Sequence, residues 1–503
     1  MATKLQPLNV LPATADHPLG EAVRADGRVL TWSELEERAR RFAHGLRHEH
    51  LHERDAWGIL ARNRLEWAEA ALGSARAGCR YVPLNWHLIA GELTELLLDS
   101  GSKLLIVAPD LETVGRQAAR AAGITRVIVF GEEYESWLAA QTATPPAECN
   151  MGAPLQYTGG TTGRSKGVVR AGTAVSASHI AAAASRWGTL VHMPERAQMM
   201  LSTPIYHALG GGVLVSAMAR GNPMLIVERS DPEQTLALIE EHRVVGTPMV
   251  PTQFVRLLKL DPIVRNRYDV SSLRWVLHTA APCPEWAKRA MIGWFGPVIV
   301  ELYGSSEGVG PVIATSEEWL AKPGTVGHAT DVLELSVLDE DGNDLPPGQI
   351  GTIYAKRVDG TPSYFGDPAK TAAMVRPDGR FTVGDLGWLD EDGYLFLADR
   401  RVDLIISGGT NIYPAEIEAV LSQHPDIADV AVFGVPHPEF GQEVKAVVEA
   451  VEGAELDVHE LIAYARAQLA SFKVPKSIDV MDKLPREASG KLKKHQLRAH
   501  YFD

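Results

Sequence analysis

The sequence predicts an α/β protein with a large N-terminal body, built on parallel sheets plus a β-rich subdomain, and a small α+β domain at its C-terminal end. Short apolar runs that alternate with helical segments predict the parallel sheets. A later change to alternating strands and turns predicts the β-rich subdomain. A new set of helices and strands after residue 400 predicts the C-terminal unit. We therefore expect one domain over residues 1–399 and another over residues 400–503.

The body is expected to open with an amphipathic helix. Thr31 and Glu34 have the spacing of a capping box, which marks a helix start. Apolar residues then recur at helical spacing, at Leu35, Ala39, Phe42 and Leu46. Further along, a strand over 104–107, a helix over 111–122 and a strand over 126–130 form the βαβ pattern of a parallel sheet.

Three more apolar runs predict strands that end in turn-forming residues. They cover 224–227, 275–277 and 298–302. Ligands of open α/β sheets bind where loops gather at the strand ends, so we expect the binding site there. Residues 333–356 alternate around a turn-rich centre, which predicts an antiparallel hairpin and a change of sheet type.

The C-terminal unit is expected to combine helices with strands. The pattern predicts helices over 415–421 and 458–469, and strands over 430–433 and 444–449. A polar stretch at 399–403 joins this unit to the body.

Composition narrows the class of protein. The 503 residues include 49 Lys+Arg and 63 Asp+Glu, a net charge of −14, which argues against a nucleic-acid-binding protein and against attraction to anionic membranes. No stretch approaches the length of an apolar membrane span. The cysteines Cys79, Cys149 and Cys283 are far apart and fit neither a disulfide scaffold nor a zinc site, so we expect a cytoplasmic protein. Its oligomeric state, monomer or homodimer, is left open.

The most specific local signal is the glycine-rich segment 157–167. Its glycines allow the backbone to bend around an anion, its hydroxyls donate hydrogen bonds, and Arg164 and Lys166 supply positive charge. The order differs from the Walker motif because Ser165 precedes Lys166. The segment therefore predicts a phosphate site outside the P-loop class, and the alternative is a flexible surface loop.

This segment resembles the phosphate loop of the adenylate-forming enzymes, which include acyl- and aryl-CoA synthetases, luciferases and the adenylation domains of peptide synthetases. Further segments resemble that family's motifs in the same order along the chain: 303–307, 384–394, 404–418 and 484–492. The length and the segment 204–207 are most similar to the aryl- and medium-chain acyl-CoA ligases. In that family the small C-terminal domain is mobile and rotates between two half-reactions.

The resemblance implies roles for individual residues in adenylation. Lys491 resembles the catalytic lysine that bridges the carboxylate and the α-phosphate, and Glu307 resembles the glutamate that holds Mg²⁺ on the ATP phosphates. Asp385 and Arg400 resemble the pair that binds the ribose. The full set implied for ATP or AMP is Thr158, Gly159, Gly160, Thr161, Thr162, Lys166, Ala280, Ala281, Pro282, Tyr303, Gly304, Ser306, Asp385 and Arg400.

The acid and the acceptor are implied to bind on either side of the adenylate. His207 resembles a catalytic residue that gates the carboxylate. The acyl pocket is implied to contain His207, Gly211, Thr279 and Val309. The CoA site is implied to contain Gly408, Gly409, Phe440 and Phe472. Two positions depart from the family: Val402 stands at the hinge, where aspartate or lysine is typical, and His87 stands where many CoA ligases have arginine.

These observations predict an ATP-dependent ligase that converts an aromatic or medium-chain acid to its acyl-AMP and then transfers the acyl group to CoA, with ATP, Mg²⁺ and CoA as its small-molecule partners. The departures at Val402 and His87 leave a second possibility open, an amide synthetase that transfers the acyl group to an amine. A third possibility is a nucleotide-binding module without catalysis, against which Lys491, Glu307, Asp385 and Arg400 speak together.

Overall fold

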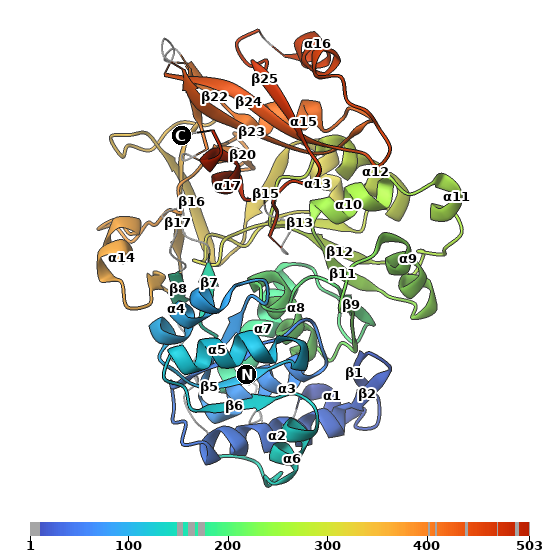
Figure 1. Ribbon diagram of the computed structural model, residues 1–503, viewed down its shortest axis with the longest axis vertical. Coiled ribbons are helices and arrows are strands. Elements are labelled where there is room, and N and C mark those ends of the chain that lie inside the picture. Colours follow the sequence, from blue (N-terminus) through green and yellow to red (C-terminus); the bar gives the residue numbers. More distant parts are fainter. Residues whose placement is uncertain are drawn as a thin grey trace.

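The structure is a computed structural model of the chain. It describes residues 11–147, 154–158, 166–169, 177–400, 403–407, 410–437, 441–469, 471–487 and 492–501. Figure 1 shows the N-terminal elements at one end of the molecule, the C-terminal sheet at the other, and a long mixed sheet between them. Within the described ranges no helix has the length and apolar character needed to cross a membrane.

The predicted βαβ units form a four-stranded parallel sheet in the order β4-β3-β5-β6. Its strands are β3 (Ala56–Leu60), β4 (Arg80–Leu84), β5 (Ser102–Val107) and β6 (Arg126–Val129). The helices of this region are α2 (Trp32–His48), α3 (Glu66–Ala77), α4 (Ala90–Ser100), the 3₁₀ helix η1 (Pro109–Leu111), α5 (Glu112–Ala121) and α6 (Glu132–Ala139). The predicted strands and helix between residues 104 and 130 are confirmed.

Helix α2 begins at the predicted capping box. The Thr31 hydroxyl accepts a hydrogen bond from the Glu34 amide at 3.2 Å, and the Glu34 carboxylate accepts one from the Thr31 amide at 2.8 Å. Two amide groups that the first helical turn leaves without partners are thereby satisfied. The predicted apolar face is fully buried: Leu35, Ala39, Phe42 and Leu46.

A second, 13-stranded sheet runs through the body in the order β16-β17-β19-β20-β15-β14-β13-β12-β11-β9-β10-β1-β2. It is parallel from β1 to β13 and antiparallel from β13 to β16, so the predicted change of sheet type is confirmed. The strands are β1 (Glu21–Ala25), β2 (Arg28–Thr31), β9 (Met199–Leu201), β10 (Met224–Ile226), β11 (Gly246–Met249), β12 (Trp275–His278), β13 (Ile299–Tyr303), β14 (Val312–Ala314), β15 (Thr325–Ala329), β16 (Leu333–Leu338), β17 (Gly351–Arg357), β19 (Asp385–Leu389) and β20 (Leu395–Arg400).

Helices and a small sheet complete the body. The small sheet has the order β18-β8-β7 and joins β7 (Gln156–Thr158) and β8 (Lys166–Val169) to β18 (Ser363–Tyr364). The remaining helices are α1 (Pro12–Asp16), α7 (Ala177–Leu190), α8 (Ala208–Ala219), α9 (Pro232–Glu241), α10 (Pro251–Leu258), α11 (Pro262–Arg265), α12 (Glu285–Phe295), α13 (Ser316–Ala321) and α14 (Pro368–Met374).

The C-terminal unit has its own sheet and core. The order is β22-β21-β24-β23, with β25 added beside β24. Its elements are β21 (Ile405–Ser407), β22 (Thr410–Ile412), α15 (Pro414–Leu421), β23 (Ile427–His437), β24 (Gly441–Ala450), α16 (Val458–Gln468), β25 (Ser477–Met481) and α17 (Lys494–Ala499). The predicted α+β character is confirmed. A domain boundary at 399–400 stays our proposal, which the change of sheet after β20 supports.

A buried ion pair joins helix α12 to strand β13. The Lys288 ammonium pairs with Glu301, and both residues are at most 8% exposed. The same Glu301 carboxylate lies 3.6 Å from Nε2 of His278, whose pKa burial and the Lys288 charge hold well below its usual value. His278 is the last residue of β12 and lies opposite Glu301 at the centre of β13, so these contacts join the end of β12 to the middle of β13.

We predict that Lys288→Met destabilises the body by about 3–5 kcal/mol, because it leaves the Glu301 carboxylate buried without its cation. Thermal unfolding followed by circular dichroism measures the change as a lower transition midpoint. The double variant Lys288→Met/Glu301→Gln removes both charges and should recover most of the loss. A double variant as unstable as the single one would contradict this assignment.

Candidate active site

The loops after three strands of the parallel region open at one edge of the 13-stranded sheet. Residues 202–207 follow β9, residues 279–284 follow β12, and residues 304–309 follow β13. Strand β11 pairs in parallel with β9 and β12, and β12 pairs in parallel with β13. The carboxyl ends of these strands therefore face the same way, at the edge where the sequence predicts a ligand site.

Tyr303 and Asp385, both predicted to bind the nucleotide, meet at this edge. The Tyr303 hydroxyl donates a hydrogen bond of 2.7 Å to Oδ2 of Asp385 across 82 residues of sequence. Asp385 is 7% exposed and stands opposite Arg400 in the antiparallel pairing of β19 and β20. The backbones of the predicted ribose pair are thus neighbours, while the Arg400 side chain lies outside the described structure.

Glu307 and Lys166, predicted to serve the phosphates, meet through Tyr364. The Tyr364 hydroxyl donates to Oε1 of Glu307 at 3.3 Å, and the Lys166 ammonium lies 5.2 Å from the centre of the Tyr364 ring. Tyr364 stands in β18, which pairs with the strand that begins at Lys166. Burial and the Glu307 charge raise the pKa of Tyr364, so its hydroxyl is protonated and able to donate at neutral pH.

Neighbouring charges shift the pKa of Lys166 in both directions. Burial, followed by the Lys370 side chain, lowers the pKa of Lys166, and the charges of Asp367 and Glu307 oppose that shift. Sequence reasoning identified Lys166 and Glu307 but missed Tyr364 and Lys370. Tyr364 and Lys370 lie far from the glycine-rich segment in sequence, and only the pairing of β8 with β18 brings them to it.

The two loops after β12 and β13, whose residues are predicted to bind ATP or AMP, have unusual backbone geometry. Ala280 has a φ of 78°, a conformation that residues with a Cβ rarely adopt and that is often found at ligand sites. A Cβ at Gly304 would lie 3.0 Å from the Val309 carbonyl oxygen, so the loop after β13 folds back closely on itself. The other nucleotide residues predicted in these two loops are Ala281, Pro282 and Ser306.

The predicted acyl residues stand where β9 leads into α8. The His207 and Tyr206 rings lie 4.3 Å apart between their centres. A Cβ at Gly210 would lie 2.2 Å from the Pro204 carbonyl oxygen, whereas Gly211 has only the Ile205 carbonyl oxygen nearby, at 3.1 Å. The helix therefore packs closely against the preceding turn at both glycines, because a Cβ at either position would crowd a backbone carbonyl oxygen.

Two other predicted acyl residues differ in exposure. Thr279 directly follows β12 and is half-buried. Val309 is 1% exposed and packs in an apolar cluster with Tyr303 and Val312. Their roles in the acyl pocket stay predictions.

Asn63 holds the acyl loop and was missed from the sequence. Its amide nitrogen donates to the Thr203 carbonyl at 3.0 Å, and its amide oxygen accepts from the Ile205 amide at 2.8 Å. Asn63 is 7% exposed, so both bonds are shielded from water. A lone asparagine after an apolar strand carries no recognisable motif.

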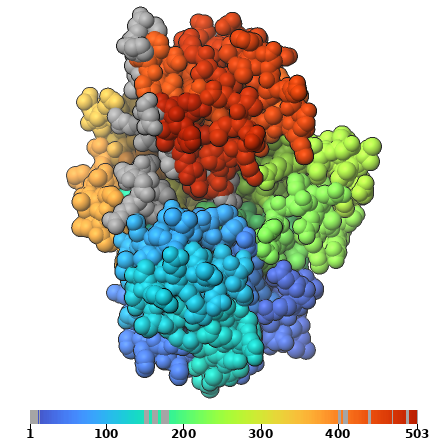
Figure 2. All heavy atoms as spheres, in the orientation of Figure 1, coloured from blue at the N-terminus to red at the C-terminus, as the bar shows by residue number. Residues whose placement is uncertain are grey.

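Parts of the C-terminal unit lie against the body (Figure 2). The Lys259 ammonium, just after α10, donates to the Ile427 carbonyl at 2.7 Å. Burial, together with the charge of Glu487, raises the pKa of Tyr206. Burial, Arg62 and Lys493 lower the pKa of His87, which disfavours its protonated form. Glu487 and Lys493 flank the segment that contains Lys491, and both act on residues of the body.

Several predicted residues lie outside the described structure, and their roles stay predictions. They are Gly159, Gly160, Thr161, Thr162, Val402, Gly408, Gly409, Phe440 and Lys491. The backbone of Thr158 ends strand β7, while its side chain is outside the described part. Phe472 is 46% exposed, and the Lys473 ammonium lies 5.7 Å from the centre of its ring.

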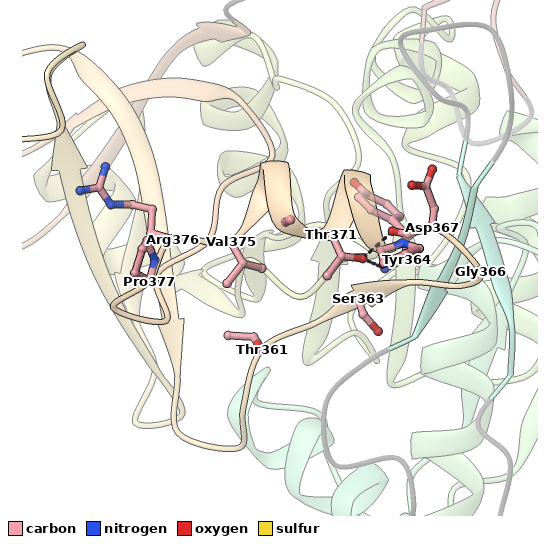
Figure 3. Close-up of a pocket in the computed structure, with 11 residues that line it drawn as sticks. Thr361, Ser363, Tyr364, Gly366, Asp367, Thr371, Val375, Arg376 and Pro377 are labelled. Atoms are coloured by element: carbon pink, nitrogen blue, oxygen red, sulfur yellow. Dashed lines mark hydrogen bonds between the residues drawn. The ribbon is translucent and has the colours of Figure 1, made fainter.

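An open cavity of about 800 Å³ lies beside helix α14 (Figure 3). Arg376 and Pro377 lie at one end of it, and Tyr364 and Asp367 lie at the other, next to strand β8. Of the residues described above as part of the site, Tyr364 and Asp367 line it. The cavity therefore adjoins the phosphate end of the site rather than the acyl end.

Comparisons with known proteins agree with this geometry. Residues 12–365 match the AMP-binding enzyme family, and residues 416–491 match the AMP-binding enzyme C-terminal domain. Feruloyl-CoA synthase of Amycolatopsis sp is 35% identical over 492 residues, which cover 96% of each chain.

Two solved structures are also similar over almost their whole length. The o-succinylbenzoate CoA synthetase of Bacillus subtilis, in complex with its acyl-adenylate intermediate, superposes with a TM-score of 0.85 at 28% identity and covers 98% of both chains. The amide bond synthetase McbA of Marinactinospora thermotolerans superposes with a TM-score of 0.82 at 26% identity, covering 96% of this chain and 97% of McbA.

The fold and the site define a nucleotide-dependent, adenylate-forming enzyme. The chain belongs to the AMP-binding enzyme family. The resemblance that the motifs indicated is confirmed, together with the expected fold class.

We predict that Tyr303→Phe weakens AMP binding about five- to tenfold, because Asp385 loses a buried hydrogen-bond donor worth about 1 kcal/mol. Isothermal titration calorimetry with AMP measures the change. The control is Tyr268→Phe, which removes a tyrosine hydroxyl that donates to Glu233 at the edge of the body. Equal affinities of the wild type and Tyr303→Phe would show that the Tyr303–Asp385 contact does not organise the nucleotide site.

Proposed function

We propose that this protein is an ATP-dependent ligase that converts an aromatic acid to its acyl-AMP and then to its CoA thioester. The observation that carries the proposal is the loop 303–307, whose first residue binds Asp385 and whose last residue binds Tyr364 beside Lys166. One short loop thereby touches both the residues proposed for the ribose and those proposed for the phosphates. The similarity to a feruloyl-CoA synthase and to an o-succinylbenzoate CoA synthetase supports an aromatic acid.

In the first half-reaction a carboxylate oxygen attacks the α-phosphorus of ATP. An O–P bond to the carboxylate forms, the bond from the α-phosphorus to the bridging oxygen breaks, and pyrophosphate leaves with that electron pair. Both reactants are anions, so fixed cations and oriented donors must offset their repulsion. We assign this work to Lys491 at the carboxylate and α-phosphate, and to Lys166 at the departing phosphates.

Glu307 is proposed to hold Mg²⁺ together with the nucleotide. Its carboxylate is a hard oxygen donor, and Mg²⁺ in phosphate-transfer sites takes one or two carboxylates with the remaining ligands from phosphate and water. The Tyr364 hydroxyl donates to one oxygen, Oε1, of that carboxylate. A bound Mg²⁺ would neutralise part of the phosphate charge.

The acid is proposed to lie between His207, Gly211 and Thr279. Gly211 adds no side chain to this region, and a Cβ there would lie 3.1 Å from the Ile205 carbonyl oxygen. Asn63 fixes the turn before His207, so the wall of this pocket is set before substrate binds.

CoA is proposed as the acceptor, with its thiol attacking the acyl carbonyl while AMP leaves. Gly408, Gly409 and Phe440 are proposed to line the pantetheine path, and the exposed ring of Phe472 is available for stacking. The small domain would rotate about Val402 between the half-reactions.

An amine acceptor remains the second candidate, and a specific observation favours it. The lowered pKa of His87 makes its imidazole a weaker source of positive charge for a CoA phosphate than an arginine would be. The similarity to the amide bond synthetase McbA fits this candidate as well.

We predict acid-dependent exchange of pyrophosphate into ATP when the protein, Mg²⁺ and a panel of aromatic and straight-chain acids are combined. Parallel reactions with CoA or with a set of amines then identify the acceptor, and we expect the CoA thioester as the greater product. A greater yield of amide would select the second candidate. Tight ATP binding without any exchange would instead favour a nucleotide-binding module that has lost catalysis.

We predict that Lys491→Ala lowers the exchange rate by about 10²–10³, the usual cost of losing one transition-state contact. The same variant should still transfer the acyl group from supplied acyl-AMP to the acceptor, because the rotated domain no longer presents Lys491. The matched control is Lys483→Ala, an exposed lysine of the same domain. Equal loss of both half-reactions in Lys491→Ala would contradict the assigned role.

A further inference from the structure

Helix α14 carries a lysine to the phosphate end of the site. The helix begins after Asp367, whose Oδ1 accepts a hydrogen bond of 2.9 Å from the Lys370 amide. The Thr371 hydroxyl accepts a bond of 2.9 Å from the Tyr364 amide and donates one of 2.9 Å to the Asp367 carbonyl. Figure 3 shows Tyr364, Asp367 and Thr371 together at this point. The start of α14 is therefore tied to the strand that contacts Lys166.

Lys370 directly precedes Thr371, whose hydroxyl binds the Tyr364 amide, and the Lys166 ammonium lies 5.2 Å from the centre of the Tyr364 ring. Tyr364 therefore links the two lysines, and burial, together with the positive charge of Lys370, lowers the pKa of Lys166. Two ammonium groups only donate hydrogen bonds, so they cannot satisfy one another. The fold nevertheless holds Lys166 and Lys370 on neighbouring elements. An anion with several oxygens could accept hydrogen bonds from both ammonium groups.

The carboxylate that pairs with Lys370 holds it only in a partly exposed ion pair. Lys370 contacts Asp367 with its ammonium 3.4 Å from Oδ2, and the two side chains are 40% and 33% exposed. A half-exposed pair between residues three apart on a helix contributes little to stability. Glu307, the other carboxylate that acts on Lys166, is assigned to Mg²⁺ above.

We propose that Lys370 is a second phosphate-binding lysine, which with Lys166 holds the β- and γ-phosphates of ATP and the pyrophosphate that leaves. This inference rests on the proposed function and extends it to a residue that no motif identifies. Pyrophosphate departs with the electron pair of the broken bond, and the Lys370 ammonium donates hydrogen bonds to its oxygens without giving up a proton. AMP lacks these phosphates and does not reach Lys370.

The test compares ligands that differ only in these phosphates. Isothermal titration calorimetry measures binding of MgATP, Mg-pyrophosphate and AMP to the full-length wild type and to Lys370→Met. We expect MgATP and pyrophosphate to bind at least about tenfold more weakly to the variant, the usual effect of losing a charged hydrogen bond, and AMP to bind equally. Lys370→Arg keeps the charge and should restore most of the affinity for MgATP.

The matched control is Lys103→Met. Lys103 also pairs with an aspartate, Asp55, and the two side chains are 51% and 22% exposed, but it lies on the four-stranded sheet away from the site. This variant should bind all three ligands like the wild type. Equal binding of MgATP by wild type and Lys370→Met, or a loss that is the same for AMP as for MgATP, would overturn the proposal.

The outcome separates this inference from the proposed function. Wild-type protein that binds MgATP but exchanges no pyrophosphate overturns the ligase reaction, while the binding comparison still decides the role of Lys370. Normal pyrophosphate exchange by the wild type, together with a Lys370→Met variant that has not lost more affinity for MgATP than for AMP, overturns the role of Lys370 alone. Wild-type protein that binds neither nucleotide overturns both.

Discussion

The site depends on the strand β13, at which the large sheet changes from parallel to antiparallel pairing. On one side its parallel neighbours supply loops that all open at the same edge. On the other side the antiparallel strand β19 brings Asp385 to the first residue of the segment 303–307, while Tyr364 of the small three-stranded sheet contacts its last residue. A uniform parallel sheet would supply the first set of residues only. The buried ion pair between Glu301 and Lys288 fixes β13 against helix α12, and so supports the loop that follows β13.

Much of the fold was predictable because short sequence patterns determine its helices and strands. The capping box at Thr31, the βαβ spacing between 104 and 130 and the alternation around 333–356 each depend on a few neighbouring residues, and each is present in the structure. Motif order was enough to identify the family. The unpredicted residues, such as Asn63 and Tyr364, act through contacts across 142 and 57 residues of sequence. No local pattern records such contacts, so they emerge only from the topology.

The charge of the molecule is distributed according to the same topology. The net charge of −14 repels nucleic acids and anionic surfaces in general. Locally, Lys166 and Lys370 converge at the phosphate end, and Arg62 and Lys493 converge near His87. The two groups come from four separate regions of the chain. An acidic protein can therefore present positive charge to an anionic nucleotide, because these cations from separate regions of the chain come together locally.

The contact between Lys259 and the C-terminal unit has a consequence for how the two parts evolve. Lys259 binds the main-chain carbonyl of Ile427, while the Ile427 side chain is 1% exposed and packs within the core of the small domain. A backbone acceptor is the same whatever side chain follows it. The core of the small domain can therefore drift or be replaced by that of a relative without disturbing this docking point. Substitutions in the core of the small domain therefore need not change its contact with Lys259.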